Sequence, residues 1–192
     1  MKVAFRQKKI PLFTQNLKIK VSYQTNSSLM ANVDAIVFQQ QALTQHNYYR
    51  FLQCAPALML NETLNTIAQS WSLHLAATHT FAHSGNTMNG EYIGENLWDT
   101  SASVAINPSN INGSSPSNAW YDEISSYNWS NPGYTSTTGH FTQLVWAGTQ
   151  VMGIGLACIS DGTTCYVTAN YYPGGNINTA AYFAANVKQS PC

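Results

Sequence analysis

Two of the four cysteines, Cys158 and Cys165, have a spacing that predicts a covalent cross-link. Asp161-Gly162, which lies between them, is a strong signal for a two-residue hairpin turn. Pairing outward from that turn places Cys158 opposite Cys165, and directly opposed residues of an antiparallel pair are within reach of a disulfide. We therefore predict a Cys158–Cys165 bond, which indicates an oxidising compartment. The alternative is a cytosolic protein with four buried free thiols.

The other two cysteines, Cys54 and Cys192, could pair with each other, but only elimination suggests it. The sequence contains no C-x-x-C pair, so a zinc site built from thiolates is not expected.

Five histidines and a small set of glutamates are the groups that could do acid–base chemistry. They are not arranged as a G-x-S-x-G nucleophile elbow, an H-E-x-x-H zinc helix or a glycine-rich phosphate loop. Ser84 follows His83, but adjacency in the sequence is not nucleophile–base geometry. Glu95 or Glu123 could serve as a general base only if it acted on an activated water. A metal-dependent hydrolase therefore stays an alternative to a binding protein.

Composition indicates a single domain with a real core, because 44% of the 192 residues are hydrophobic. Only 8% of the residues are charged, against roughly 25% in an average soluble protein. No stretch of the chain approaches the roughly 18–20 apolar residues of a membrane span.

Charge is distributed very unevenly along the chain. Six of the eight basic residues lie in the first twenty positions, whereas the rest of the chain carries eight acids and two bases, a net charge of −6. We therefore predict a basic N-terminal arm over residues 1–31 and a folded domain over residues 32–192. The six cations are Lys2, Arg6, Lys8, Lys9, Lys18 and Lys20.

The basic arm has several interpretations. It lacks the apolar core of a secretory signal peptide, so it is a disordered tail, a misassigned start, an organellar presequence or a segment that visits anionic membranes. An acidic body without a basic groove argues against a nucleic acid partner.

Hydrophobic periodicity predicts helices early in the chain and a β-hairpin late. We expect helices at about 34–51, at 117–127 and at 139–146, and another that is capped by Asn61 and carries an apolar stripe as far as Leu75. Strands are expected at 151–159 and 164–171. Residues 80–116 look mostly irregular. This order favours α+β layering over alternating β and α units.

Five short blocks, in order along the chain, resemble the motifs of the CAP superfamily (cysteine-rich secretory proteins, antigen 5 and pathogenesis-related proteins). Ala169 stands where many members have a cysteine, and the Golgi-associated plant-pathogenesis-related group shares that departure and the run YNWSNPGY at 127–134. The blocks are residues 46–50 (HNYYR), 94–97 (GENL), 120–123 (WYDE), 139–149 (GHFTQLVWAGT) and 166–177 (YVTANYYPGGNI).

The resemblance implies a three-layer α-β-α sandwich with a central antiparallel sheet and an open cleft. It also places four residues in that cleft: His83, Glu95, Glu123 and His140. Imidazole and carboxylate groups suit Zn²⁺, so we expect a weak zinc site with His83 and His140 as ligands, not essential for folding. The alternative is a polar network that ties loops together without a metal.

The resemblance further implies a binding module for sterol or another lipid, in the secretory pathway or outside the cell. Golgi or membrane association is the second expectation for its location. The lipid loop would be the aromatic segment with Tyr127, Trp129, Pro132 and Tyr134, whose rings could wall a groove or simply pack the domain. A protein-interaction module whose cleft has no ligand is the remaining alternative.

Overall fold

The computed structural model describes residues 26–191, with side chains from Asp34 onward. Residues 1–25 of the predicted basic arm lie outside the described residues, and the first helix already begins at Asn26. The elements in chain order are α1 (Asn26–Leu52), β1 (Met59–Leu60), α2 (Glu62–Thr78), β2 (Thr87–Met88), β3 (Glu91–Tyr92), β4 (Gly94–Ser101), the 3-10 helix η1 (Pro108–Asn110), α3 (Ser114–Asp122), the 3-10 helix η2 (Glu123–Ser126), α4 (Gly139–Leu144), β5 (Val151–Cys158), β6 (Thr164–Tyr172) and α5 (Ala180–Asn186).

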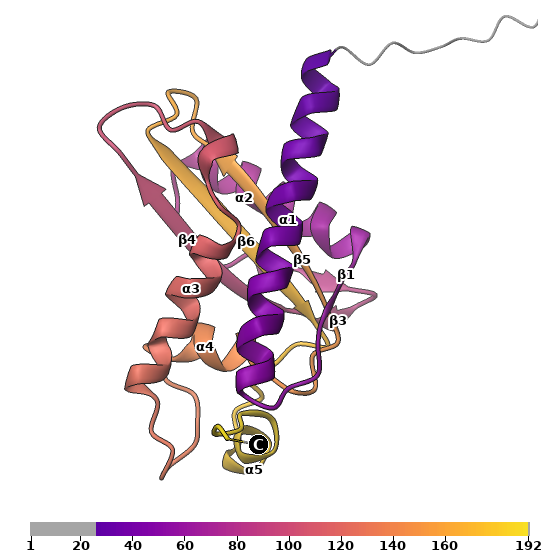
Figure 1. Ribbon diagram of the computed structural model, residues 1–192, viewed down its shortest axis with the longest axis vertical. Helices are drawn as coiled ribbons and strands as arrows, with labels where there is room; N and C mark the ends of the chain where they lie inside the picture. Colours follow the sequence, from indigo (N-terminus) through magenta and orange to yellow (C-terminus); the bar gives the residue numbers. More distant parts are fainter. Residues whose placement is uncertain (1–25, 192) are drawn as a thin grey trace, which may run out of the picture.

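The central sheet has the strand order β1-β5-β6-β4. The pairs β5–β6 and β6–β4 are antiparallel, and the two-residue β1 adds a parallel edge to β5. Helices α1 and α3 cover one face of the sheet, and α2 covers the opposite face (Figure 1). The predicted α+β sandwich is therefore confirmed, with a short parallel edge that the sequence pattern did not indicate.

The region expected to be irregular, residues 80–116, instead contains the edge strand β4 and the small β2–β3 hairpin. Strand β4 reads GENLWDTS and does not show the alternation of polar and apolar residues that marks a half-buried strand. Its eight residues pair with β6 from Gly94↔Tyr171 to Ser101↔Thr164. Pairing with a buried neighbour therefore decides its conformation.

Strand β5 packs flush against α2 because glycines face the helix. A Cβ at Gly153 would lie 2.1 Å from the carbonyl carbon of Leu64, and one at Gly155 would lie 2.4 Å from the Cα of Gln69. The alternate residues Met152 and Ile154 point to the other face and are fully buried in the main core. Strand β5 thus packs against α2 through its glycines and against the main core through its large side chains.

The hairpin between β5 and β6 carries the predicted disulfide. Cys158 pairs with Cys165 in the register of the two strands, and a Cys158–Cys165 disulfide joins them with a Cα–Cα distance of 3.9 Å. Gly162 in the turn has a φ of +74°, a conformation that favours glycine. The prediction of this bond is confirmed. Cys192 lies outside the described residues, so its pairing with Cys54 stays a prediction.

Arg50, at the end of α1, is fully buried and binds backbone carbonyls instead of a carboxylate. Its guanidinium donates to Pro56 O at 2.7 Å, and burial lowers its pKa to about 10. Three further bonds, at 2.8–3.0 Å, reach carbonyls at the end of α4 and in the turn that follows it, which are those of Leu144, Trp146 and Thr149. These bonds fix the end of α1 against the segment that follows α4. None of the helices in the described part of the chain is long and apolar enough to cross a membrane.

Candidate functional site

A cleft of about 510 Å³ opens at the start of the edge strand β4. Because β4 is the last strand of the sheet, groups from both helical layers can reach around its end. Glu95 lies on the α2 side of β4, where His83 follows α2, and His140 comes from α4 on the opposite side. All three of these predicted residues line the cleft. Glu123 does not line it and instead lies behind His140.

Glu95 is held by four hydrogen bonds. Its Oε1 accepts from His83 Nδ1 at 2.9 Å and from the Ser84 amide at 2.8 Å. Its Oε2 accepts from Ser84 Oγ at 2.6 Å and from Asn170 Nδ2 at 3.3 Å. Burial alone would raise the pKa of Glu95, but the bonds from His83, Ser84 and Asn170 outweigh it and hold the pKa below its usual value. The same bond to Glu95 raises the pKa of His83.

His140 forms a second pair with the same geometry. Its Nδ1 bonds Glu123 Oε1 at 2.7 Å, while Glu123 Oε2 accepts from the amides of His140 and Phe141 at 3.0 Å each. The carboxylate of Glu123 therefore binds both the imidazole and the first turn of α4. Asn96 Nδ2 donates to His140 O at 3.0 Å, which fastens this turn to β4.

The two pairs leave the same atom available on each histidine. An imidazole whose Nδ1 donates to a carboxylate presents Nε2 as a lone-pair donor, which is the usual arrangement of a histidine that binds a metal. The carboxylates themselves are occupied by hydrogen bonds. Among residues 34–191, no three groups of the His, Cys, Asp and Glu types converge on one point. The residues thus fit a cation held by two imidazoles with water in the open positions, not a closed cage.

The hydrogen bonds to the Glu95 carboxylate also affect its suitability as the general base of a hydrolase. A general base needs a pKa near the working pH and a free lone pair directed at water. The pKa of Glu95 is shifted away from that range, and both of its oxygens already accept two bonds.

A buried series of polar groups lies behind the cleft; the sequence indicated a structural, hydrogen-bonded role for His46 but not its partners. Asn96 also donates to Tyr171 Oη at 3.3 Å, and that hydroxyl bonds His46 Nε2 at 2.8 Å. His46 Nδ1 lies 2.9 Å from Ser117 Oγ. Asn96 was visible only as part of the GENL block. This series of hydrogen bonds links α1, α3, β4 and β6 beneath the cleft.

The aromatic loop predicted to bind lipid lies mostly against the core. Tyr127 is buried, its ring packs edge-on against Phe141, and Trp129 packs against both rings. Pro132 is half-buried. Tyr134 is exposed and lines the cleft. Of the two roles open for this loop, the contacts of Tyr127 and Trp129 favour packing of the domain.

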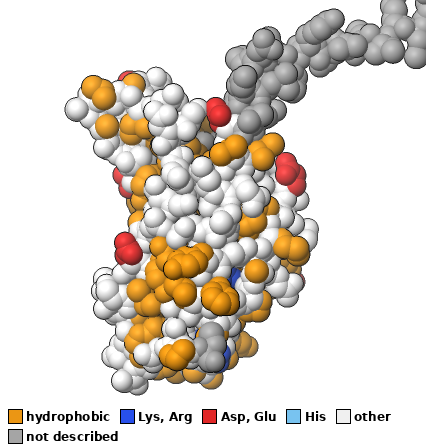
Figure 2. Space-filling view, viewed as in Figure 1, with side chains coloured by type: hydrophobic (Ala, Val, Ile, Leu, Met, Phe, Trp, Pro, Cys, Tyr) orange, Lys and Arg blue, Asp and Glu red, His pale blue; other side chains and the backbone are white. Residues whose placement is uncertain are grey.

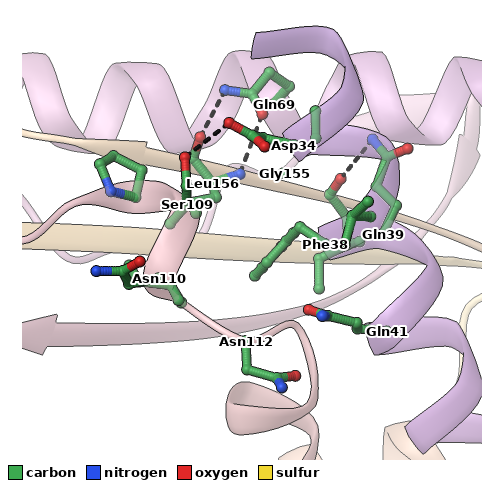
Figure 3. A pocket seen from close by; sticks show the side chains of 15 residues that line it. Asp34, Phe38, Gln39, Gln41, Gln69, Ser109, Asn110, Asn112, Gly155 and Leu156 are labelled. Atoms are coloured by element: carbon green, nitrogen blue, oxygen red, sulfur yellow. Dashed lines mark hydrogen bonds between the residues drawn. The ribbon is translucent and has the colours of Figure 1, made fainter. Parts of the chain in front are cut away.

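A second cavity, of about 450 Å³, lies between α1 and η1 over strand β5 (Figure 3). Phe38 and Ile154 form part of its lining and belong to the buried core. Five amide side chains also line it, and four of them already bond the backbone: Gln39 to Ile154 O, Gln69 to Leu156 N and O, Gln41 to Gly113 N, and Asn112 to Ser114 N. The cavity therefore offers fewer free polar atoms than its residue types suggest.

A three-layer sandwich with two histidine–carboxylate pairs at the open end of its sheet is the architecture of a CAP domain. The family profile "CAP: Cysteine-rich secretory protein family" matches residues 43–171, and the chain belongs to this family.

Curated relatives agree with this assignment. The chain is 40% identical over 150 residues to the human Golgi-associated plant pathogenesis-related protein 1, covering 78% of this chain and 92% of that protein. It is 35% identical over 154 residues to Protein PRY2 of Saccharomyces cerevisiae, covering 78% of this chain but only 41% of that protein.

Solved structures show the same fold at lower identity. BmVAL-1 matches with a TM-score of 0.62 and 22% identity, covering 81% of this chain and 84% of that one. The crystal structure of NaASP2 with Zn²⁺ matches with a TM-score of 0.61 and 24% identity, covering 83% and 88%.

Proposed function

We propose that this CAP domain is a binding module whose cleft takes a divalent cation, Zn²⁺ in the first instance, through His83 and His140. The observation that carries the proposal is the pairing of each imidazole with a carboxylate at Nδ1, which leaves Nε2 available on two histidines that line the same cleft. With two protein ligands, the affinity is weak and folding does not depend on the metal. NaASP2, a structural neighbour, was crystallised with Zn²⁺.

Calorimetric titration with Zn²⁺ tests the cation site. We expect saturable binding by the wild type, loss of binding in His83→Ala/His140→Ala, and a roughly 10- to 100-fold weaker affinity in Glu95→Gln, because an outer-sphere carboxylate orients its histidine. His74→Ala, an exposed histidine on α2, is the matched control and should bind as the wild type does. Unchanged binding in the double variant would place the metal elsewhere.

We also propose that the domain binds a lipid or sterol, in the cavity between α1 and η1. The support is its apolar floor and the prior engagement of four of its five amides, which together leave room for an apolar ligand. Because Tyr127 and Trp129 pack against Phe141, the aromatic loop is the weaker location for this ligand.

Extraction of the purified protein followed by mass spectrometry, with labelled cholesterol and a labelled fatty acid as probes, tests the lipid proposal. Ile111→Trp adds bulk at the cavity and should block retention of the probe. Val104→Trp adds the same bulk at an exposed site and should not. Trp129→Ala should lower stability and leave binding nearly intact. A loss of binding in Trp129→Ala alone, at a temperature where this variant is folded, would indicate that the ligand binds at the aromatic loop.

The remaining alternatives have less support. A hydrolase would depend on Glu95 or Glu123, whose oxygens are already hydrogen-bonded. A protein-interaction module predicts neither saturable zinc nor lipid binding. For location, we propose the secretory pathway, since the hairpin disulfide suits an oxidising compartment and relatives carry the names Golgi-associated plant pathogenesis-related protein 1 and Salivary antigen-5.

A further inference from the structure

Two exposed tyrosines flank the cleft, and each ring rests on a glycine. Tyr92, from β3, is 63% exposed, and a Cβ at Gly174 would lie 2.5 Å from its Cδ1. Tyr134 is 50% exposed, and the three atoms nearest to a Cβ at Gly139 all belong to its side chain, the closest being Cε2 at 2.9 Å. Because glycine has no side chain, each tyrosine ring packs directly against the backbone, while much of the ring surface stays exposed to solvent.

The cleft between these rings is polar and carries little net charge to offer a ligand. No lysine or arginine is among the described residues that line it, so the side chains that most often bind phosphate or sulfate groups are missing there. The oxygens of Glu95 are already occupied by hydrogen bonds, which makes the site a poor match for an ammonium ligand. The remaining polar lining consists mainly of neutral amides and hydroxyls. The side chains of Ser84, Asn96 and Asn176 already make hydrogen bonds within the protein, whereas those of Asn86, Ser136 and Asn178 keep their polar atoms available.

Neutral amides and hydroxyls beside fixed aromatic rings match one ligand chemistry closely. A pyranose ring has a flat face of C–H groups, which packs on an aromatic ring, and an edge of hydroxyls that both donate and accept hydrogen bonds. Asparagine and serine side chains also both donate and accept, so they complement those hydroxyls in either direction. The volume of the cleft, about 510 Å³, lies within the range of small-molecule sites.

We propose that the cleft binds a neutral saccharide, with sugar faces against Tyr92 and Tyr134 and sugar hydroxyls bonded mainly by Asn86, Ser136 and Asn178. The proposal rests on the proposed function only in using the same cleft; ring stacking does not require the cation. Gly139 and Gly174 have a role in this site, because a larger residue at either position would displace the tyrosine ring that packs against it.

Binding of neutral tetrasaccharides of glucose, mannose and N-acetylglucosamine to the full chain tests the proposal. Saturation-transfer NMR and calorimetry would be run after EDTA treatment and again with Zn²⁺. We expect at least one of these sugars to bind, and Tyr92→Ala and Tyr134→Ala to weaken it by about five- to tenfold each, as expected for losing one aromatic contact. Tyr134→Phe keeps the ring and should bind within about twofold of the wild type, a change of under 0.5 kcal/mol.

Tyr182→Ala is the matched control, because Tyr182 on α5 is also 50% exposed and does not line the cleft. Thermal melting of each variant establishes that it is folded. Wild-type protein that binds none of the sugars, with or without Zn²⁺, would overturn the proposal, as would binding that survives both alanine variants.

Zinc titration of the tyrosine variants separates the two proposals. Sugar binding that persists in protein that takes up no Zn²⁺ would end the cation proposal and support this one. Zinc binding without any sugar binding would do the reverse.

Discussion

His46 has no exposed surface, and both of its ring nitrogens make hydrogen bonds inside the core. Nδ1 bonds Ala42 O at 2.8 Å and Ser117 Oγ at 2.9 Å, and Nε2 bonds Tyr171 Oη at 2.8 Å. Burial lowers the pKa of His46 to about 4; the bond to Ala42 opposes this shift and the nearby Arg50 adds to it. The imidazole is therefore neutral in the folded protein and has a structural role.

This depressed pKa predicts an acid sensitivity of folding. The unfolded chain binds a proton at His46 near pH 6.5 and the folded chain only near pH 4, so stability is complete above pH 6.5 and falls as the pH drops toward 4. At about 1.4 kcal/mol per pKa unit, the loss is about 3 kcal/mol. Urea unfolding of the wild type and His46→Gln across this range measures it.

The comparison between the two proteins isolates the histidine. Carboxylates such as Glu95 contribute to the acid sensitivity of both proteins and cancel in the difference. His46→Gln should be less stable at pH 7.5 but should lose less stability on acidification. Parallel curves for the two proteins would contradict the assignment.

At the scale of residues, the sequence predicted the site better than its surroundings. His83, Glu95 and His140 line the cleft as the resemblance to the CAP superfamily implies, whereas Glu123, expected in the cleft as well, lies behind His140 as its partner. The contacts that tune these groups were not predictable. Tyr92, for example, reaches the cleft from a two-residue strand, and Gly174, against which its ring packs, lies 82 positions further along the chain. Only the folded chain brings such pairs together.

Among the elements, strand β5 has an open edge, because β1 covers only its first two residues and no other strand of residues 26–191 pairs with the rest of that edge. Amide side chains from the helices satisfy the open backbone groups instead. Asn65 Oδ1 accepts from Ile154 N at 3.0 Å and Gln39 Nε2 donates to Ile154 O at 3.3 Å. Gln69 bonds both Leu156 N and Leu156 O, at 3.1 and 2.9 Å. This amide row replaces a strand and prevents edge-to-edge pairing.

The amide row predicts a specific cost for removing one member. Gln69→Leu keeps the size of the side chain but leaves the N–H and C=O of Leu156 without partners, so we expect a loss of about 1–3 kcal/mol in the free energy of unfolding. Gln40→Leu, an exposed glutamine on α1, should change it by no more than about 0.5 kcal/mol. Equal effects of the two substitutions in chemical denaturation would indicate that water satisfies this edge.

Elements with strong periodicity were predictable, and elements defined by their partners were not. Helix α2 and the β5–β6 hairpin lie where the pattern of apolar residues and the Asp161-Gly162 turn placed them, whereas α1 ends as predicted but begins at Asn26, eight residues early. The predicted helix at 117–127 instead begins at Ser114 and gives way to η2 at Glu123. Strand β4 was missed because its sequence carries a site residue, Glu95, and a buried amide, Asn96, where alternation would require other residues.

Over the whole molecule, charge separates the folded body from the start of the chain. The six cations before residue 21 lie outside the described residues, and the rest of the chain has eight acids and two bases. One of those bases, Arg50, is buried. The face in Figure 2 accordingly shows scattered acidic groups, very little basic surface and an expanse of apolar side chains over its lower half. The body alone would be repelled by an anionic surface.

This asymmetry predicts that membrane attraction depends on the first twenty residues. The full chain should bind vesicles containing phosphatidylserine at low salt and dissociate at high salt, because each cation near the surface contributes about 1 kcal/mol and screening removes it. A chain that begins at Asn26 keeps α1 whole and should not bind. The matched control is the full-length chain with all six cations replaced by glutamine, which keeps the length and should also stay in solution. Sedimentation with the vesicles measures all three proteins. Salt-resistant binding by the chain that begins at Asn26 would show instead that the apolar surface of the folded domain carries the attraction.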